Sequence, residues 1–226
     1  MPRTMSRAEA RAFYDRFGAK QDLQGFYENP ALDALVRHGR FGEARRVMEF
    51  GCGTGRLAAR LLGDCLPADA EYTAIDASHT MIELTRARLA PWAERVKIVE
   101  ADTVPEERSR AGGWERFVST YVLDLLSPED IGRVLARAHE ALAPGGRLGL
   151  VGLTFGRGAL GRTVTGLWRA AHAFRPQWVG GCRPLRLEPY LSEDRWRIEH
   201  REVVQSFGIA SEVVWACPVA HAAVAG

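Results

Sequence analysis

A strand-like segment of the chain runs directly into three glycines at alternate positions. Val47-Met48-Glu49-Phe50 is followed by Gly51-Cys52-Gly53-Thr54-Gly55, and a helical pattern begins after it. Glycines permit a tight turn and let backbone N–H groups approach a ligand closely. Because open α/β sheets bind ligands at the carboxyl ends of their strands, we expect this loop to hold a small polar ligand. The alternative is a strand-to-helix turn that holds no ligand.

The spacing of these glycines argues against two common nucleotide-binding loops. A dinucleotide fingerprint reads G-x-G-x-x-G, and its third glycine would fall on Arg56. The chain also lacks G-x-x-x-x-G-K-[ST], which excludes a P-loop. A nicotinamide-dependent oxidoreductase therefore stays as an alternative that Arg56 disfavours.

Two carboxylates stand at the ends of the next two strand-like segments. Asp76 ends Tyr72-Thr73-Ala74-Ile75-Asp76, where its carboxylate can accept hydrogen bonds from both hydroxyls of a ribose. Asp102 ends Ile98-Val99-Glu100-Ala101-Asp102, where it can accept from an adenine amino group. Read singly, Asp76 is a helix cap and Asp102 a solvated loop acid. At successive strand ends of one sheet, with the glycine loop, they favour a nucleoside site.

Short apolar runs alternate with helical patterns from Arg45 onward. Strands are expected at 45–51, 71–76, 95–102, 115–122 and 147–154, and helices at 54–62, 78–89 and 128–142. This alternation predicts βαβ units, a parallel sheet and right-handed crossovers. Two further strands, 196–208 and 210–219, read as an antiparallel pair joined through Gly208. The predicted fold is α/β, a Rossmann-like seven-stranded mostly parallel sheet with helices on both faces and an antiparallel C-terminal strand pair.

Three further helices are expected outside the region where strands and helices alternate. Ser6 can cap a helix over 6–17, with Glu9 as the capping-box partner. Asn29-Pro30 opens a second helix that runs to His38. A third helix is expected over 159–174, with its apolar side chains on one face. That face comprises Leu160, Val164, Leu167, Trp168, Ala171 and Phe174.

Five segments together resemble the class I S-adenosylmethionine (SAM)-dependent methyltransferases. In order, they are EFGCGTGRLAARL, AIDASHTMIELTRARL, VEAD, STYVLDLL and LAPGGRLGLVGLT. The chain looks most like the small-molecule branch typified by ubiquinone- and menaquinone-biosynthesis enzymes, the methyltransferase type 11 group. The resemblance covers residues 45–154. It implies a single methyltransferase domain over 1–226, with lid helices at 1–40, a SAM-binding core at 45–154, a substrate-covering insertion at 155–190 and the strand pair at 191–226.

The resemblance implies SAM as cofactor and assigns contacts to it. In that family the glycine loop holds the methionine part of SAM, with Glu49 supporting the loop. The other implied contacts are to the ribose, the adenine and the transferred methyl group. The full set is Tyr14, Glu49, Gly51, Cys52, Gly53, Gly55, Asp76, Ala77, Met81, Asp102, Thr103 and Thr120. Within this set Asp76 binds ribose, Ala77 and Met81 border the adenine, Asp102 and Thr103 hold its edge, and Thr120 with Tyr121 lines the methionine and the methyl group. Tyr14, on the lid helix, reaches over the cofactor or is simply a half-buried aromatic.

Methyl transfer is an in-line displacement, so the protein must chiefly align a nucleophile and exclude water. A general base is needed only where the acceptor must lose a proton. Tyr121 and Asp124 are the catalytic candidates; Asp124 reads as a base, a substrate anchor or a capping acid before Ser127. Relatives often carry His-His where Asp124 stands, and Phe-Asp where this chain has Glu115 before the fourth strand. His172 reads as a structural or surface histidine, and His79 as adjacent to the cofactor.

The segment between Phe155 and Leu187 contains six arginines and no Asp or Glu. They are Arg157, Arg162, Arg169, Arg175, Arg183 and Arg186, interleaved with Trp168, Phe174 and Trp178. Such a segment suits a cover over an anionic or lipid-like acceptor, or a contact with a membrane surface. The plainer interpretation is a helix that packs its apolar face on the sheet while its arginines stay in water.

Composition limits the remaining choices. The chain has 226 residues, a hydrophobic fraction of 46% and a net charge of +2, which suit a globular domain and do not demand nucleic acid as a partner. Four cysteines without metal spacing, no signal-like N-terminus and no long apolar run favour a cytoplasmic protein without a metal or a transmembrane segment. The expected function is methyl transfer to O, N or C of a small molecule. Lipid methylation at a membrane surface and a non-catalytic SAM-binding protein are the alternatives.

Overall fold

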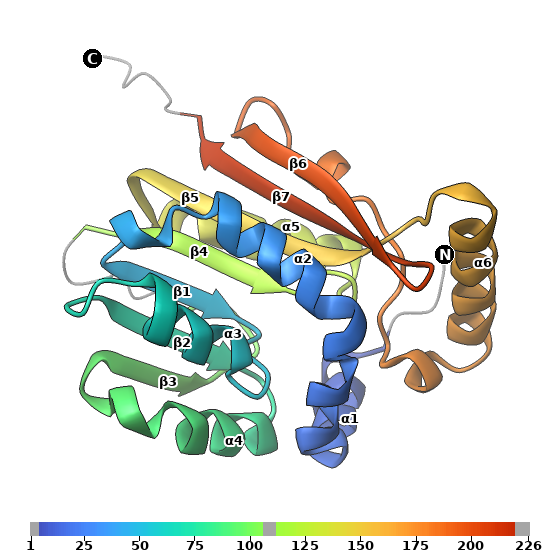
Figure 1. Cartoon of the computed structure of the whole chain (residues 1–226), viewed down its shortest axis with the longest axis horizontal. Helices are drawn as coiled ribbons and strands as arrows, with labels where there is room; N and C mark the ends of the chain where they lie inside the picture. The colour runs from blue at the N-terminus through green and yellow to red at the C-terminus, as the bar shows by residue number, and fades with distance from the viewer. Residues whose placement is uncertain (1–4, 106–111, 220–226) are drawn as a thin grey trace.

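The computed structural model describes residues 5–105 and 112–219, which form a seven-stranded sheet with helices on both faces (Figure 1). The strand order is β3-β2-β1-β4-β5-β7-β6. The first five strands are parallel, and β7 pairs antiparallel with both β5 and β6. The bounds are β1 Arg46–Phe50, β2 Glu71–Asp76, β3 Val96–Glu100, β4 Trp114–Thr120, β5 Leu142–Thr154, β6 Trp196–Ser206 and β7 Ile209–Pro218. The predicted fold class is confirmed.

Six α-helices surround the sheet in the described part of the chain. They are α1 Arg7–Phe17, α2 Gly25–His38, α3 Arg56–Arg60, α4 His79–Leu89, α5 Pro128–Ala141 and α6 Gly158–Phe174. In Figure 1, α2 crosses in front of the sheet and α5 lies behind it. Because successive strand residues point to opposite faces, Val118 joins the apolar core under α2 and α3, whereas Phe117 joins the core under α5.

Two predicted helix boundaries are wrong. The helix expected to open at Pro30 begins at Gly25, so Pro30 lies inside α2 and cannot donate a hydrogen bond there. A 3₁₀ segment, Gly18–Gln24, leads directly into α2 and moves its start upstream. The helix expected over 54–62 is only α3, which continues into a π-helical turn at Leu61–Cys65.

The predicted C-terminal strand pair is confirmed, and its turn explains the sharp reversal. Phe207 and Gly208 both have positive φ, 52° and 82°, as a two-residue type I′ hairpin turn requires. β7 then lies against β5, where a Cβ on Gly149 would come within 2.6 Å of the Trp215 ring. Trp215 also donates its indole N–H to the Leu35 carbonyl at 3.1 Å, which ties the sheet to α2.

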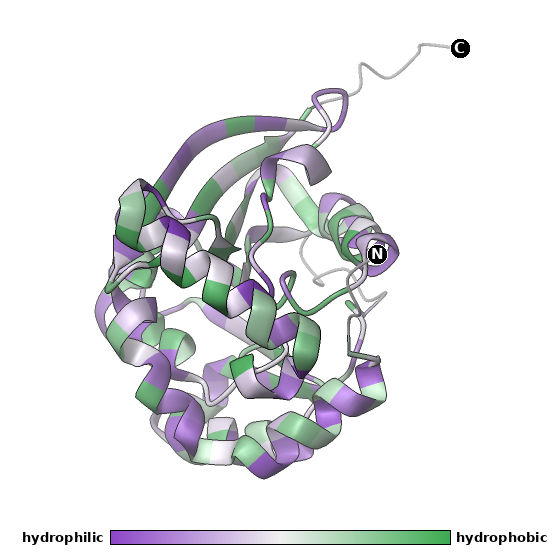
Figure 2. Cartoon of the chain, turned by 90° about the vertical axis from the view of Figure 1, so that its right-hand side faces the viewer, coloured by the Kyte–Doolittle hydropathy of each residue, from purple (hydrophilic) through white to green (hydrophobic). Residues whose placement is uncertain are grey.

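The apolar face expected for α6 is only partly buried. Leu160, Leu167 and Phe174 are exposed, whereas Gly161, Thr165 and His172 are buried on the side that faces the protein. The helix stands beyond the end of the sheet and packs mainly on β7 and on the 3₁₀ segment Pro176–Val179, so it has little surface to cover its apolar stripe. Figure 2, viewed from the α6 side, shows hydrophobic and hydrophilic residues alternating around the helices that face the viewer.

Candidate functional site

A cavity of about 470 Å³ opens at the carboxyl ends of β1, β2 and β4, below α1. Its volume is in the range of small-molecule sites. The lining combines the glycine loop, the residues at the ends of β1, β2, β3 and β4, and the first helix with the residues next to it. From these elements it takes Phe50, Gly51, Gly53, Asp76, Ala77, Ser78, Ala101, Asp102, Thr120, Tyr121, Val122, Arg7 and Tyr14. The site therefore lies at the edge of the sheet where strand polarity predicts it.

The glycine loop adopts a backbone that other residues tolerate poorly. Gly51, Gly53 and Gly55 have φ of 79°, 54° and 76°, all in the left-handed region. The N–H groups of Gly51 and Cys52 both donate to the Ile75 carbonyl, at 2.8 and 2.9 Å, so the loop is fixed to β2. A Cβ on Gly51 would come within 2.1 Å of Val122 Cγ2. The close approach of β1 and β4 ends is thus possible only with glycine there.

Asp76 connects the glycine loop to the start of α4. Its carboxylate accepts the Gly53 N–H at 2.8 Å and the Ser78 N–H at 2.9 Å. Burial raises the pKa of the Asp76 carboxyl, while these backbone donors oppose the rise. Ser78 caps α4 and donates its hydroxyl to Asp15 on α1 at 2.6 Å. The loop, α4 and α1 are therefore held in one hydrogen-bonded unit around the cavity.

The first helix covers the cavity through polar contacts. Ser6 and Glu9 form the predicted capping box, and α1 buries none of its residues fully. Arg7 donates to Asp130 and lies 3.6 Å from Asp102, and Arg11 pairs with Glu100 at 2.5 Å. The Tyr14 hydroxyl donates to the Gly180 carbonyl at 3.3 Å. These contacts connect α1 to α5, to the end of β3 and to the segment after α6, and they hold α1 over the site.

The cavity brings together eight of the residues that the sequence singles out. They are Tyr14, Gly51, Gly53, Asp76, Ala77, Asp102, Thr120 and Tyr121. Six others lie outside its lining: Glu49, Cys52, Gly55, Met81, Thr103 and Asp124. Cys52 and Gly55 are buried within the glycine loop, and Met81 is buried within α4. Thr103, which follows β3, is exposed. Their predicted cofactor contacts stay predictions.

Glu49 is a buried acid directly behind the glycine loop. It is 1% exposed and accepts the Tyr72 O–H at 2.8 Å. Burial raises its pKa to about 8, and the hydrogen bond from Tyr72 only partly opposes this rise. This raised pKa favours the protonated form of Glu49 at neutral pH, in which Glu49 is a neutral support for the loop.

Replacing Glu49 with glutamine should flatten the dependence of stability on pH. Because the folded-state pKa is raised, the folded protein holds the proton more tightly than the unfolded chain, so stability present at low pH is lost as pH rises toward 8. Between about pH 6 and pH 9 the free energy of unfolding of Glu49→Gln should fall by about 2 kcal/mol less than that of the wild type. Urea denaturation of the ligand-free proteins measures this, with Glu83→Gln on the surface as control. Parallel wild-type and Glu49→Gln curves would show that Glu49 is ionised in the folded state.

The two catalytic candidates have different surroundings. Tyr121 has φ 56°, lines the cavity, and shares a hydrogen bond of 2.9 Å with the Ser211 hydroxyl. Asp124 is completely buried, accepts the Leu153 N–H at 3.1 Å, and receives an Arg183 N–H at its backbone carbonyl. Burial raises the pKa of Asp124 to about 6. Asp124 thus joins β4, β5 and the segment after α6, whereas Tyr121 faces the cavity.

Three other polar residues from the sequence analysis have structural partners. His172 is buried with its Nε2 3.1 Å from the Gly181 carbonyl, and His79 is exposed beside Glu100 at 2.9 Å. Glu115, expected to replace the family's aspartate before β4, accepts the Arg45 backbone N–H at 2.6 Å. It also pairs with Arg46 at 2.9 Å, which fixes the start of β1 against β4.

Several cavity residues carry no sequence signal for this role. Met5, Arg7 and Gln21 come from the N-terminal region, and Leu125 and Asp130 follow β4. Gln21 Oε1 is buried without a hydrogen-bond partner among the described residues, and it lies 2.7 Å from a Cβ built on Gly53. Gln21 belongs to the 3₁₀ segment Gly18–Gln24, which has no apolar periodicity that could have marked it. An unsatisfied acceptor above the loop fits a ligand that brings a hydrogen-bond donor.

Comparison with known proteins agrees with this geometry. Residues 47–146 match the profile of a family described as a methyltransferase domain. A carboxy-S-adenosyl-L-methionine synthase of Chromohalobacter salexigens is 35% identical over 133 residues, which cover 57% of this chain and 47% of that protein. A malonyl-[acyl-carrier protein] O-methyltransferase of Geobacter sulfurreducens is 35% identical over 105 residues, 46% of this chain and 37% of that protein. The chain spans about half or less of the length of these curated relatives.

Solved structures show the same fold. The N-methyltransferase NodS of Bradyrhizobium japonicum, in complex with S-adenosyl-L-homocysteine, matches with a TM-score of 0.60 at 18% identity. The match covers 84% of this chain and 86% of that one. The mitomycin 7-O-methyltransferase matches with a TM-score of 0.63 at 21% identity, over 84% of this chain and 53% of that one.

The sheet order, the glycine loop and the acids at the strand ends define a Rossmann-like domain built to hold a nucleoside ligand. More particularly, residues 47–146 match a methyltransferase domain, and the relatives and solved neighbours support a class I SAM-dependent methyltransferase with SAM as its cofactor. The narrower likeness to quinone-biosynthesis enzymes stays a prediction. The residues present fit SAM, since the cavity is lined by the glycine loop, by the Asp76 carboxylate and by Gln21, whose Oε1 has no hydrogen-bond partner among the described residues.

Proposed function

We propose that this protein transfers a methyl group from SAM to a small-molecule acceptor by in-line displacement. The observation that carries the proposal is the joining, in one cavity, of the glycine loop, Asp76 and the end of β4 at Thr120 and Tyr121. When bound, SAM supplies a sulfonium methyl group that is already activated for transfer. The protein's task is then to orient the two reactants and to exclude water.

The position of each cavity residue supports a specific orientation of the cofactor. Gly51 and Gly53 leave room for the methionine part, and Asp76 stands at the end of β2 for the ribose hydroxyls. Ala77 and Asp102, at the ends of β2 and β3, border the adenine. In this arrangement Thr120 and Tyr121 face the methyl group, and Tyr14 closes the cavity from α1. Gln21 Oε1 accepts a hydrogen bond from the amino group of the methionine part.

The acceptor side of the cavity is mostly apolar. Beyond Tyr121 the wall consists of Met5, Val122, Leu125 and Leu126, with the Ser127 hydroxyl as a polar contact. A compact, largely apolar acceptor with few polar groups suits this wall. Solved neighbours named for small-molecule methylation favour such an acceptor over a lipid. We propose that residues 1–40 act as the lid, 45–154 as the cofactor-binding core and 155–190 as the acceptor cover.

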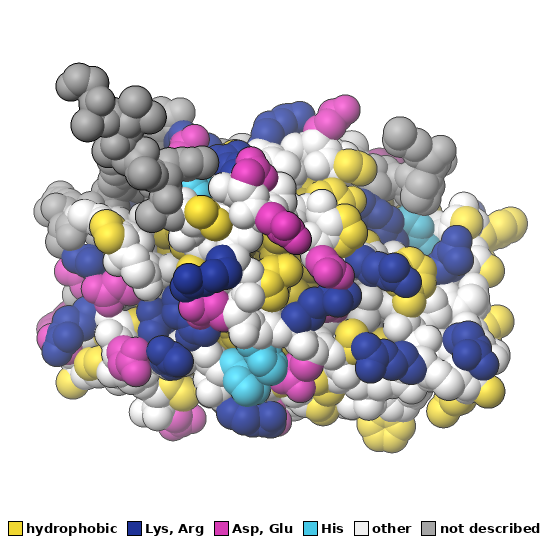
Figure 3. Space-filling model, turned by 90° about the horizontal axis from the view of Figure 1, so that it is seen from above, with side chains coloured by type: hydrophobic (Ala, Val, Ile, Leu, Met, Phe, Trp, Pro, Cys, Tyr) yellow, Lys and Arg dark blue, Asp and Glu magenta, His cyan; other side chains and the backbone are white. Residues whose placement is uncertain are grey.

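The basic segment 155–187 and the length of the helices bear on what the protein binds. Figure 3 shows basic and hydrophobic side chains gathered toward the α6 end of the molecule, where the arginines of 155–187 lie. Within the described residues, no helix is both long and apolar enough to cross a bilayer. None of the six arginines of this segment lines the cavity, and Arg183 donates to the carbonyls of Asp124 and Leu126, so the proposed acceptor does not depend on them.

Calorimetric titration with SAM, S-adenosylhomocysteine and NADH tests the cofactor half of the proposal. We expect binding of the two sulfur compounds at micromolar concentrations and no binding of NADH. Failure of a folded protein to bind either sulfur compound would overturn the proposal. Mass spectrometry of reactions with candidate phenols and amines then tests transfer. Formation of S-adenosylhomocysteine together with a methylated acceptor supports it, whereas SAM returned unchanged with every acceptor would contradict it.

A further inference from the structure

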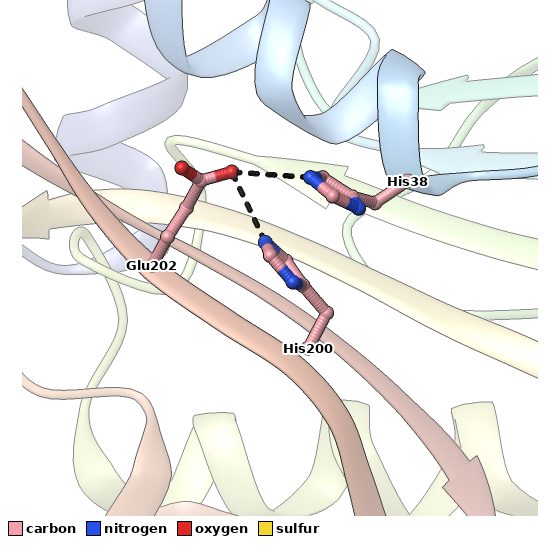
Figure 4. Close-up of side chains that lie close together, drawn as sticks. All are labelled: His38, His200 and Glu202. Atoms are coloured by element: carbon pink, nitrogen blue, oxygen red, sulfur yellow. Dashed lines mark hydrogen bonds and ion pairs between the residues drawn. The ribbon is translucent and has the colours of Figure 1, made fainter.

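A cluster of two histidines and one glutamate lies away from the cavity, where α2 meets the edge strand of the sheet. His38 is in the last turn of α2, and His200 and Glu202 are on β6 (Figure 4). Their ligating atoms lie within 4.8 Å of one another, and within residues 5–105 and 112–219 no other group of three such side chains meets this condition. We propose that these residues form a binding site for a divalent transition-metal ion of the zinc type.

The ligand set and its spacing match such an ion. Two imidazole nitrogens and a carboxylate oxygen suit Zn²⁺, which is commonly held by two His and one Glu with a fourth position open to water. Zinc–ligand bonds of about 2.0–2.1 Å place neighbouring ligand atoms of a tetrahedron about 3.3 Å apart. Nε2 of His38 and of His200 lie 3.6 and 3.0 Å from Oε1 of Glu202. The two observed spacings therefore lie on either side of the tetrahedral value.

Both imidazole rings lie close to the same carboxylate oxygen of Glu202. Both rings point to Oε1 of Glu202, and they stack on each other with centroids 3.6 Å apart and planes at 16° (Figure 4). Nearly parallel rings do not aim their lone pairs at one point, so the rings must rotate about Cβ–Cγ when a metal binds. The side chains of His38 and His200 are 36% and 27% exposed, which leaves room for this rotation.

The backbone on both sides of the cluster is held firmly. Arg147 donates to the His38 carbonyl at 2.8 Å, and Arg116 donates to the carbonyls of Gly39 and Arg40 at 2.6 and 2.7 Å. The end of α2 is thus fixed to β4 and β5. On β6, the register shifts between Ile198 and His200, an irregularity that re-aims side chains. His200 and Glu202, two residues apart on a strand, then face the same side.

A bound ion would connect the N-terminal third of the chain to its C-terminal strand pair. His38 at the end of α2 and His200 on β6 are far apart in the sequence, so a metal ion held by both closes a long loop of the chain. A cross-link that closes a long loop restricts the unfolded chain most. None of the three ligands lines the cavity, so the proposed metal site is separate from methyl transfer. Loading it should stabilise the fold without changing the affinity for SAM.

Titration of the untagged, chelator-treated protein with ZnCl₂ tests this proposal. We expect one equivalent bound with micromolar affinity and a rise in the Tm of about 5 °C at saturating zinc. His38→Gln, His200→Gln and Glu202→Gln should each weaken binding about 10-fold or more. In Co²⁺-loaded protein the visible spectrum should lack a thiolate-to-metal band, which separates this site from the four cysteines.

His79→Gln provides the matched control, because His79 also pairs with a glutamate, Glu100, but has no third ligand in the described structure. It should leave zinc affinity and the zinc-dependent Tm unchanged. Circular dichroism of the three ligand variants verifies that they fold. The proposal is overturned if the wild type binds no zinc, if the ligand variants bind it as well as the wild type, or if the cobalt spectrum shows thiolate ligation.

Discussion

Asp76→Ala should weaken SAM binding by about 100-fold or more while the protein stays folded. A carboxylate that accepts two ribose hydroxyls contributes about 1.5 kcal/mol or more per hydrogen bond, since bonds to charged groups are the strong ones. In the ligand-free structure the same oxygens accept the Gly53 and Ser78 N–H groups, so the substitution also loosens the loop. Calorimetric titration with SAM, together with the Tm of each protein, measures both effects.

Two companion variants separate the ribose contact from loop support. Asp76→Asn preserves the shape and one acceptor oxygen, so it keeps one of the two backbone hydrogen bonds and should lose less affinity and less stability than Asp76→Ala. Asp69→Ala removes an exposed acid, paired with Arg45, before the start of the same strand and should bind SAM normally. If Asp76→Ala binds SAM as tightly as Asp69→Ala, the ribose assignment is wrong.

Gly51→Ala should abolish measurable SAM binding and lower the free energy of unfolding by about 2 to 4 kcal/mol. The added Cβ meets Val122 Cγ2 at 2.1 Å, and the φ of 79° disfavours any side chain. To relieve the overlap, the end of β1 must move away from the end of β4, which displaces the loop that faces the cavity. Urea denaturation and SAM titration provide the two measurements.

Gly145→Ala is the control for the backbone strain alone. Gly145 has a similar φ of 75°, but a Cβ there meets nothing within 4 Å. It should cost about 1 kcal/mol and leave SAM affinity intact. Adding Val122→Ala to Gly51→Ala removes the overlapping methyl groups and should restore part of the stability. A Gly51→Ala protein as stable as Gly145→Ala, with normal SAM affinity, would show that the close approach of β1 and β4 is unimportant.

The sheet and its ligand-binding edge could be predicted because their signals are local. Each strand is a short apolar run, and Asp76 and Asp102 follow two of these runs directly. The position of β6 at the edge of the sheet also has a local signal in the sequence. β6 carries charged side chains at alternate positions, as edge strands do, whereas β7 is almost continuously buried.

The rest of the site depends on contacts between distant segments, which leave no periodic pattern. Arg7 reaches Asp130, 123 residues away, and Gln21 lies over Gly53 only because the 3₁₀ segment before α2 folds across the loop. Likewise, the helical period identifies α6, but it does not reveal that the helix extends past the sheet and leaves Leu167 in solvent. Asp124 follows β4 as expected, yet its carboxylate turns toward Leu153.

In the arrangement that we propose, α1 covers the cofactor site and sets how the cofactor enters and leaves. This helix has no fully buried residue, and its ion pairs through Arg7 and Arg11 join side chains that are all partly exposed to solvent. Such pairs contribute little free energy and are screened by dissolved ions, whereas the backbone bonds of the glycine loop are not. We therefore expect ionic strength to change the rate at which S-adenosylhomocysteine leaves and SAM enters, and to leave the shape of the glycine loop unchanged.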